Sequence, residues 1–138
     1  ASTEATYKPA ASLDDIKQLA LKMNYPFTIE VRTMGELPSL DAVTASTLYR
    51  ITQESITNSA RHGRQVENLL VIIQAQGDSI VLTAENDGGL IASSYSPGLG
   101  IQGMKERVSL LGGEFFAGPK GTGGWCVRAA LPVRELKS

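Results

Sequence analysis

YRITQESITNSARHG, residues 49–63, is the stretch that says most about how this chain folds. Read as a helix, it stacks Glu54, Asn58 and Arg61, at positions i, i+4 and i+7, along one side. The apolar residues around this row are spaced to pack against a core, and a glycine suits the C-terminal cap. The expected inward residues are Leu48, Ile51, Ile56 and Ala60, with Tyr49 at the core edge and Gly63 as the cap.

The polar row on this helix has two interpretations. It is either a solvated stripe of an amphipathic helix or one wall of a site for Mg²⁺ and phosphates. In the second case Asn58 offers a neutral oxygen to the metal, Glu54 an acceptor near the reacting centre and Arg61 a phosphate partner. The rest of the sequence has to decide between them.

Composition restricts the class of protein. The 138 residues fit one domain, and 42% apolar with 20% charged residues is ordinary for a soluble globular chain. A net charge of −1 gives no reason to expect binding to nucleic acid or direct contact with a membrane. Cys126 is a lone cysteine, which suits a reducing cytoplasm. No apolar run approaches the roughly 20 residues that span a bilayer, and no signal peptide is visible.

Periodicity and turn residues predict the order α-β-α-β-β-loop-α-β-β. So many consecutive strands exclude an all-parallel sheet and predict an α+β, two-layer fold, with helices on one face of a mixed sheet. Residues 1–11 are expected to be a disordered lead-in, 12–134 one domain and 135–138 a tail. The expected elements are a helix 12–24, a strand 27–32, a long helix capped by Asp41, strands 67–76 and 79–85, a loop 87–98, a helix 99–111 stopped by Gly112-Gly113, and strands 114–117 and 125–131 around a turn at 118–121.

Glycines are concentrated in the second half: twelve of the fourteen lie between Gly77 and Gly124. This density reflects either many turns or close approach of the backbone to phosphate groups. The string GLGIQG, residues 98–103, favours phosphate, because it lies where a helix begins and its N–H groups are free.

The same string fits G-x-G-x-x-G, but the surrounding sequence excludes the classes of protein that usually carry this motif. Loop residues rather than a strand precede it, and Lys120 and Thr122 stand where a dinucleotide-binding fold would place an acid. No H-R-D or D-F-G string follows, as a eukaryotic-type protein kinase requires, and no Walker A sequence is present. Phosphate binding remains the prediction.

A third polar segment, ENDGG at residues 85–89, ends a predicted strand. Its short side chains could accept a hydrogen bond from an adenine amino group, and its glycines would let the base approach the backbone. A plain Asn-Asp-Gly-Gly turn is the alternative.

Together these segments resemble the Bergerat-fold (GHKL) ATP-binding domain of two-component sensor histidine kinases, in the branch that pairs with NarL-type response regulators. The likeness covers about residues 12–134, and its four motifs occur in the family order. They are the N box at Tyr49–Asn58 with Arg61 and His62, the first glycine box at Glu85–Gly89, the second at GLGIQGMKERV (98–108), and a Gly-Thr element at Gly121–Gly124.

The resemblance implies ATP and Mg²⁺ as cofactors. Asn58 would coordinate the metal, Glu54 would assist phosphoryl transfer, and a lid at Leu90–Pro97 would close over the nucleotide. Lys105 and Arg107 are alternative phosphate or structural partners. The implied ATP-binding residues are Asn58, Arg61, His62, Asn86, Asp87, Gly89, Gly98, Leu99, Gly100, Gly103, Met104, Lys105 and Thr122.

Two departures from the family pattern are visible. The first glycine box usually reads D-D-G-x-G or D-N-G-x-G, whereas Asn86 stands here at the place of the adenine-reading aspartate, and no spacer separates Gly88 from Gly89. The adenine contact is therefore either Asn86 or Asp87. No phosphoacceptor helix precedes residue 12, and His62 lies inside the N box, so it is not expected to be the phosphorylated histidine.

The resemblance predicts the catalytic domain of a sensor histidine kinase, a protein-histidine kinase, in the cytoplasm, with a parent that could be anchored in the inner membrane. Its partners would be the dimerisation and phosphoacceptor domain of the same kinase and a NarL-type response regulator. Two alternatives stay open: a free-standing serine protein kinase of the same fold, and a module that senses nucleotide without transferring phosphate.

Overall fold

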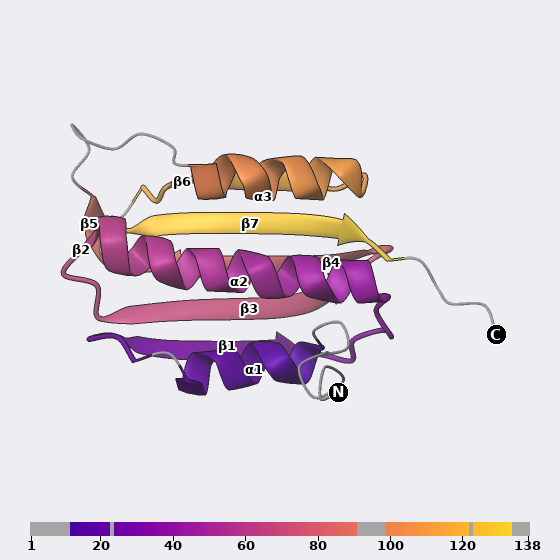
Figure 1. Ribbon diagram of the computed structural model, residues 1–138, viewed down its shortest axis with the longest axis horizontal. Coiled ribbons are helices and arrows are strands. Elements are labelled where there is room, and N and C mark those ends of the chain that lie inside the picture. Colours follow the sequence, from indigo (N-terminus) through magenta and orange to yellow (C-terminus); the bar gives the residue numbers. More distant parts are fainter. Residues whose placement is uncertain (1–11, 23, 91–98, 122, 134–138) are drawn as a thin grey trace, which may run out of the picture.

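Three helices cover one face of a five-stranded sheet in the computed structural model (Figure 1), which describes residues 12–22, 24–90, 99–121 and 123–133. The elements follow the order predicted from the sequence, with two short strands in addition. They are α1 (Leu13–Lys22), β1 (Thr28–Met34), α2 (Ala42–His62), β2 (Gly63–Arg64), β3 (Asn68–Gln76), β4 (Ser79–Asn86), β5 (Gly89–Leu90), α3 (Leu99–Leu110), β6 (Glu114–Pro119) and β7 (Trp125–Pro132).

The sheet is mixed, with the strand order β1-β3-β4-β7-β6. Strands β1 and β3 are parallel because α2 crosses over between them, and the other neighbours are antiparallel. The predicted α+β class, with two layers and helices on one face, is therefore confirmed. Among the residues described, no helix combines the length and apolarity needed to cross a bilayer.

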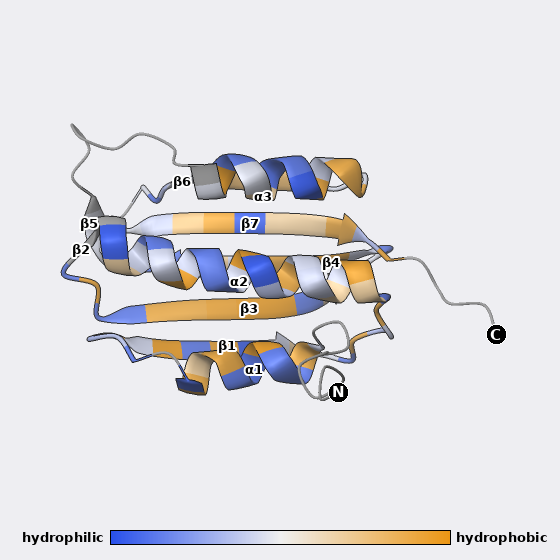
Figure 2. Cartoon of the chain, viewed as in Figure 1, coloured by the Kyte–Doolittle hydropathy of each residue, from blue (hydrophilic) through white to orange (hydrophobic). Residues whose placement is uncertain are grey.

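The core lies between the sheet and the helices. Alternate residues of β3 point toward the helices, so Leu69, Val71 and Ile73 are buried against α2. Figure 2 shows β3 as apolar over most of its length, as expected for a central strand. Burial of these side chains holds α2, and the polar row it carries, in a fixed place on the sheet.

Three helix ends form as their residues predict, whereas the predicted cap glycine of α2, Gly63, begins β2 instead. Ser12 accepts a hydrogen bond from the Asp15 backbone N–H at α1, and Asp41 caps α2 by accepting from the Thr44 N–H at 2.7 Å. Helix α3 ends in a Schellman motif: Gly113 N–H donates to the Val108 carbonyl, and Gly112 has φ +78°.

One inward residue of α2 was predicted wrongly. Ala60 is exposed, whereas Ser59 beside it is buried, together with Thr52 and Ser55. The apolar side chain of Ala60 had suggested that this residue faces the core. Ser59, four residues after Ser55, lies on the buried side instead, and its hydroxyl accepts a hydrogen bond from Asn86 at the end of β4. The inward stripe of α2 is therefore partly polar.

Some element boundaries also differ from the prediction, and one strand pair was not predicted. Helix α1 ends at Lys22, before Asn24. Gly118 and Pro119 belong to β6 rather than to the turn, because Pro119 closes an edge strand, where a missing N–H is tolerated. The pair β2–β5 was not predicted, since strands of two residues show no periodicity. The predicted lead-in 1–11, tail 135–138 and lid residues 91–97 lie outside the described ranges.

Candidate functional site

The predicted motifs meet at one end of the molecule. Figure 1 shows the C-terminal end of α2, the beginning of α3 and the β2–β5 pair at the same end of the sheet. Strand β4 ends there as well, because its last residue, Asn86, pairs with Leu69 at the start of β3 and with Trp125 at the start of β7. The topology therefore brings together segments as far apart in the sequence as the end of α2 at His62 and the start of β7 at Trp125.

The polar row of α2 lies beside its buried stripe. Glu54 and Asn58 are partly buried, and Arg61 is exposed. The Asn58 side-chain nitrogen is shut off from solvent and has no hydrogen-bond partner among the residues that the structure describes. The oxygen and nitrogen of an amide are told apart by their hydrogen-bond partners, so the buried atom could be either one. In both cases the protein leaves the hydrogen bonding of the Asn58 amide incomplete. A ligand at this place could complete it.

Helix α3 approaches α2 at Glu54. The carboxylate of Glu54 lies over Gly100, the second residue of α3, so the N box and the second glycine box are in direct contact. Of the other residues predicted in this box, Gly103 has open space beside it, Met104 is buried in the core, and Lys105 is exposed on the outer face of α3.

Asn86, one candidate for the adenine contact, is buried and already hydrogen-bonded. Its amide nitrogen donates to the Ser59 hydroxyl on α2 at 3.0 Å, and its amide oxygen accepts from the Gly88 N–H at 3.1 Å. The Gly88 N–H can only donate, so the amide atom that faces it must be the oxygen of Asn86. The nitrogen of Asn86 therefore faces α2. The extra donor that an asparagine carries in place of an aspartate thus finds its acceptor in Ser59.

Asp87, the other candidate, is exposed but also engaged. One carboxylate oxygen accepts from the Glu67 and Asn68 backbone N–H groups, at 2.8 and 2.9 Å, and the other accepts from the Asn68 side chain at 2.9 Å. These hydrogen bonds, the backbone one from Asn68 first, hold the pKa of Asp87 below its usual value. Asp87 therefore ties the end of β4 to the start of β3.

This clamp predicts a pH dependence of stability. A lowered pKa in the folded state means that Asp87 contributes stability above its unfolded pKa, about 3.9, and that this contribution is lost as pH falls through the folded pKa. We expect Asp87→Asn to destabilise the protein at pH 7 and to flatten the decline in the free energy of unfolding below about pH 4. Urea unfolding from pH 2 to 7 measures both.

Glu36→Gln is the matched control, since Glu36 is an exposed carboxylate for which no hydrogen bond is described. It should leave stability and its pH dependence close to those of the parent chain. Equal acid sensitivity of Asp87→Asn and the parent would show that the clamp contributes nothing.

The hairpin between β6 and β7 borders the same end of β4. A side chain at Gly124, which has φ +92°, would collide with the Asn86 carbonyl oxygen, so glycine is needed there for both conformation and space. Glu85, the residue before Asn86 on β4, forms an ion pair with Lys120 of the hairpin. Its Oε1 lies 3.5 Å from the Lys120 Nζ.

Several predicted site residues have no described side-chain position. Gly98 and Thr122 lie outside the described residues. His62 ends α2 and Leu99 begins α3, but the structure describes only their backbone. Gly89 pairs with Arg64 in the β2–β5 ladder, which joins the end of α2 to the chain just after Asp87.

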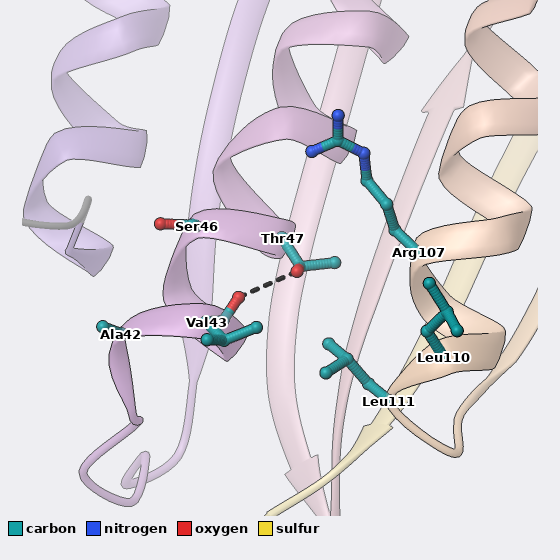
Figure 3. Close-up of a pocket in the computed structure, with 7 residues that line it drawn as sticks. All are labelled: Ala42, Val43, Ser46, Thr47, Arg107, Leu110 and Leu111. Atoms are coloured by element: carbon teal, nitrogen blue, oxygen red, sulfur yellow. Dashed lines mark hydrogen bonds between the residues drawn. The ribbon is translucent and has the colours of Figure 1, made fainter.

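A groove of about 350 Å³ lies away from these residues, between the beginning of α2 and the end of α3 (Figure 3). Val43 and Thr47 of α2 face Arg107, Leu110 and Leu111 across it. None of the predicted ATP-binding residues lines this groove. Arg107, one of the two alternative phosphate partners, lines this groove, and its guanidinium extends toward α2 (Figure 3).

No protein-family model matches the chain. In sequence it is similar to sensor histidine kinase ComP of Bacillus subtilis, 37% identical over 93 residues, and to the signal transduction histidine-protein kinase/phosphatase UhpB of Salmonella typhimurium, 38% identical over 91 residues. The matches cover 64% and 65% of this chain, but only 12% and 18% of the relatives. The chain therefore corresponds to a small part of their length.

In fold, the chain is similar to the histidine kinase domain of the blue-light activated histidine kinase from Erythrobacter litoralis EL346. The TM-score is 0.62 at 20% identity, over 87% of this chain and 57% of that one. The resemblance predicted from the sequence is thus confirmed: the relatives of this chain are sensor histidine kinases, and its fold is that of a histidine kinase domain, consistent with the ATP-binding domain of a UhpB-like kinase.

Proposed function

We propose that this chain binds Mg²⁺-ATP and is the catalytic domain of a sensor histidine kinase. It would transfer the γ-phosphate of ATP to a histidine on a dimerisation domain outside this chain. A NarL-type response regulator would then take the phosphate from that histidine.

The observation that carries this proposal is the contact of Glu54 on α2 with the first turn of α3, one helical turn before Asn58. This arrangement combines a carboxylate, an incompletely bonded amide and the N-terminus of a helix, where N–H groups have no partner within the helix. Phosphoryl transfer depends mainly on positioning and on compensation of charge, and these are the groups it requires.

The residues fit Mg²⁺-ATP in kind. Asn58 provides an amide whose nitrogen lacks a partner among the described residues, and an amide oxygen is a suitable ligand for a hard cation. Bound Mg²⁺ would neutralise charge on the phosphate oxygens. Glu54 has no ion pair among the described residues, so its carboxylate is free to accept a proton or to orient the incoming imidazole.

At the other side of the site, the hydrogen bonds of Asn86 and Asp87 support a positioning role for both. Asn86 joins β4 to α2, and Asp87 joins β4 to β3, so the turn at Gly88 is held on both sides. The Asn86 oxygen retains a second lone pair, which could accept from the adenine amino group. We favour Asn86 over Asp87 for that contact, because the three hydrogen bonds of Asp87 are made to the start of β3 and the residue before it.

Under this proposal the domain works in the cytoplasm, beside the dimerisation domain of its own parent kinase. Labelled ATP provides the test: the γ-phosphate should pass to the parent's dimerisation domain when this chain and Mg²⁺ are both present. We expect Glu54→Gln to reduce the transfer rate by about 10²–10⁴-fold, the usual contribution of a positioned acid or base.

Two results would count against the proposal. Transfer to serine on another protein would favour the free-standing serine kinase. Tight ATP binding with no transfer to any acceptor would favour a nucleotide sensor.

A further inference from the structure

Gly100 lies directly under the Glu54 carboxylate. A Cβ atom built on residue 100 would stand 2.5 Å from Oε2 of Glu54 and 3.2 Å from its Cδ. Real Cβ atoms essentially never come within 3.0 Å of a heavy atom from a residue distant in the chain. The carboxylate therefore occupies the space that any side chain at this position would need.

The need for glycine here is one of space and not of backbone conformation. Gly100 is helical and is absent from the glycines with positive φ. One turn further along α3, Gly103 has no heavy atom within 4 Å of its would-be Cβ. These two glycines of the box are therefore in different situations, and of the two it is Gly100 whose Cβ position is occupied by a residue of α2.

The carboxylate has a physical reason to stay at this place. The first turn of α3 contains no acidic residue, although the partial positive charge at a helix N-terminus favours one. Glu54 brings that negative charge from the neighbouring helix. No ion pair of Glu54 with another described residue competes for it.

We infer that Gly100 is a positioning residue for Glu54: it leaves the room in which the carboxylate rests against the first turn of α3. This inference rests on the proposed role of Glu54 in phosphoryl transfer. It gives Gly100 a purpose different from close approach of phosphate to the backbone, because a side chain at residue 100 would displace Glu54 even without nucleotide.

The steric part is tested by thermal unfolding, without any nucleotide. Gly100→Ala is made in three backgrounds: the parent chain, Glu54→Gln, which keeps the side-chain shape, and Glu54→Ala, which removes it. In Glu54→Ala the substitution should raise Tm by about 3 °C, the gain from alanine in a helix. In the other two backgrounds the gain should be smaller, because the flexible end of residue 54 must move aside.

Gly103→Ala is the matched control for stability. Its surroundings are open, so it should raise Tm by the same amount in all three backgrounds. An equal rise for Gly100→Ala in all three would overturn the inference, because the carboxylate would then not occupy that space.

The functional part separates nucleotide binding from transfer. Gly100→Ala should keep Mg²⁺-ATP affinity within about threefold. It should lower the rate of phosphoryl transfer as much as Glu54→Gln does, and the double variant should be no slower than either single variant. Loss of ATP affinity with transfer unchanged at saturating ATP would show that Gly100 serves the phosphates instead.

Failure of the proposed function gives a different pattern. If the parent chain does not bind Mg²⁺-ATP, the proposal for ATP fails, while the dependence of the Gly100→Ala Tm shift on residue 54 still decides whether the two residues are coupled.

Discussion

Asn58→Ala is expected to weaken Mg²⁺-dependent ATP binding by about 10- to 100-fold or more, the range over which residues around a metal affect its affinity. Asn58 is the amide in the polar row of α2, and its nitrogen is buried without a partner. Alanine removes the oxygen that a hard cation would use. Calorimetric titration with ATP, with and without Mg²⁺, measures the change.

The fold should survive this substitution. Because the Asn58 nitrogen makes no hydrogen bond, alanine leaves no partner unpaired at that atom, and Tm should stay close to that of the parent chain. Asn58→Asp is the matched variant: it retains an oxygen and should retain the response to Mg²⁺. Unchanged affinity and unchanged Mg²⁺ dependence in Asn58→Ala would exclude Asn58 from the metal site.

Asn86→Ala is expected to have the second-largest effect, on both stability and nucleotide binding. It removes a buried amide that bonds Ser59 on α2 and the Gly88 N–H in the turn. Leaving buried polar partners unsatisfied costs about 1–3 kcal/mol in the free energy of unfolding, and the same amount is expected in ATP binding if Asn86 accepts from adenine. Urea unfolding and ATP titration measure the two losses separately.

Two further variants place the contact. Asp87→Ala should lower stability through β3 but reduce ATP affinity less than Asn86→Ala does. Ser59→Ala should weaken ATP binding in the parent chain, since it leaves the Asn86 nitrogen without its acceptor. In the Asn86→Asp background, which lacks that donor, Ser59→Ala should weaken ATP binding less. Loss of binding in Asp87→Ala alone would transfer the adenine contact to Asp87.

The elements of the fold were predictable because each carries a local signal. The alternation in β3 and the cap residues Ser12 and Asp41 act over a few neighbouring positions, and the structure follows them. The prediction for Ala60 was wrong for the opposite reason. The apolar side chain of residue 60 favoured the core, but the partner that Ser59 meets there, Asn86, lies 27 positions away and leaves no local signal.

The interior of the candidate site was less predictable for the same physical reason. The motifs identify which residues gather at this end of the sheet, but the contacts between them are long-range: Asp87 with Asn68, and Glu54 with Gly100. Such pairs leave no periodic pattern in one sequence. The roles of these residues toward ATP and Mg²⁺ stay predictions.

Calorimetric titration of the parent chain with a non-hydrolysable ATP analogue, in the presence and absence of Mg²⁺, tests the proposed function most directly. If Asn58, Glu54 and the first turn of α3 form a phosphate and metal site, the analogue should bind at one site per chain and at least about tenfold more tightly with Mg²⁺. No binding in either condition, or the same affinity in both, would contradict a Mg²⁺-ATP site at this end of the sheet.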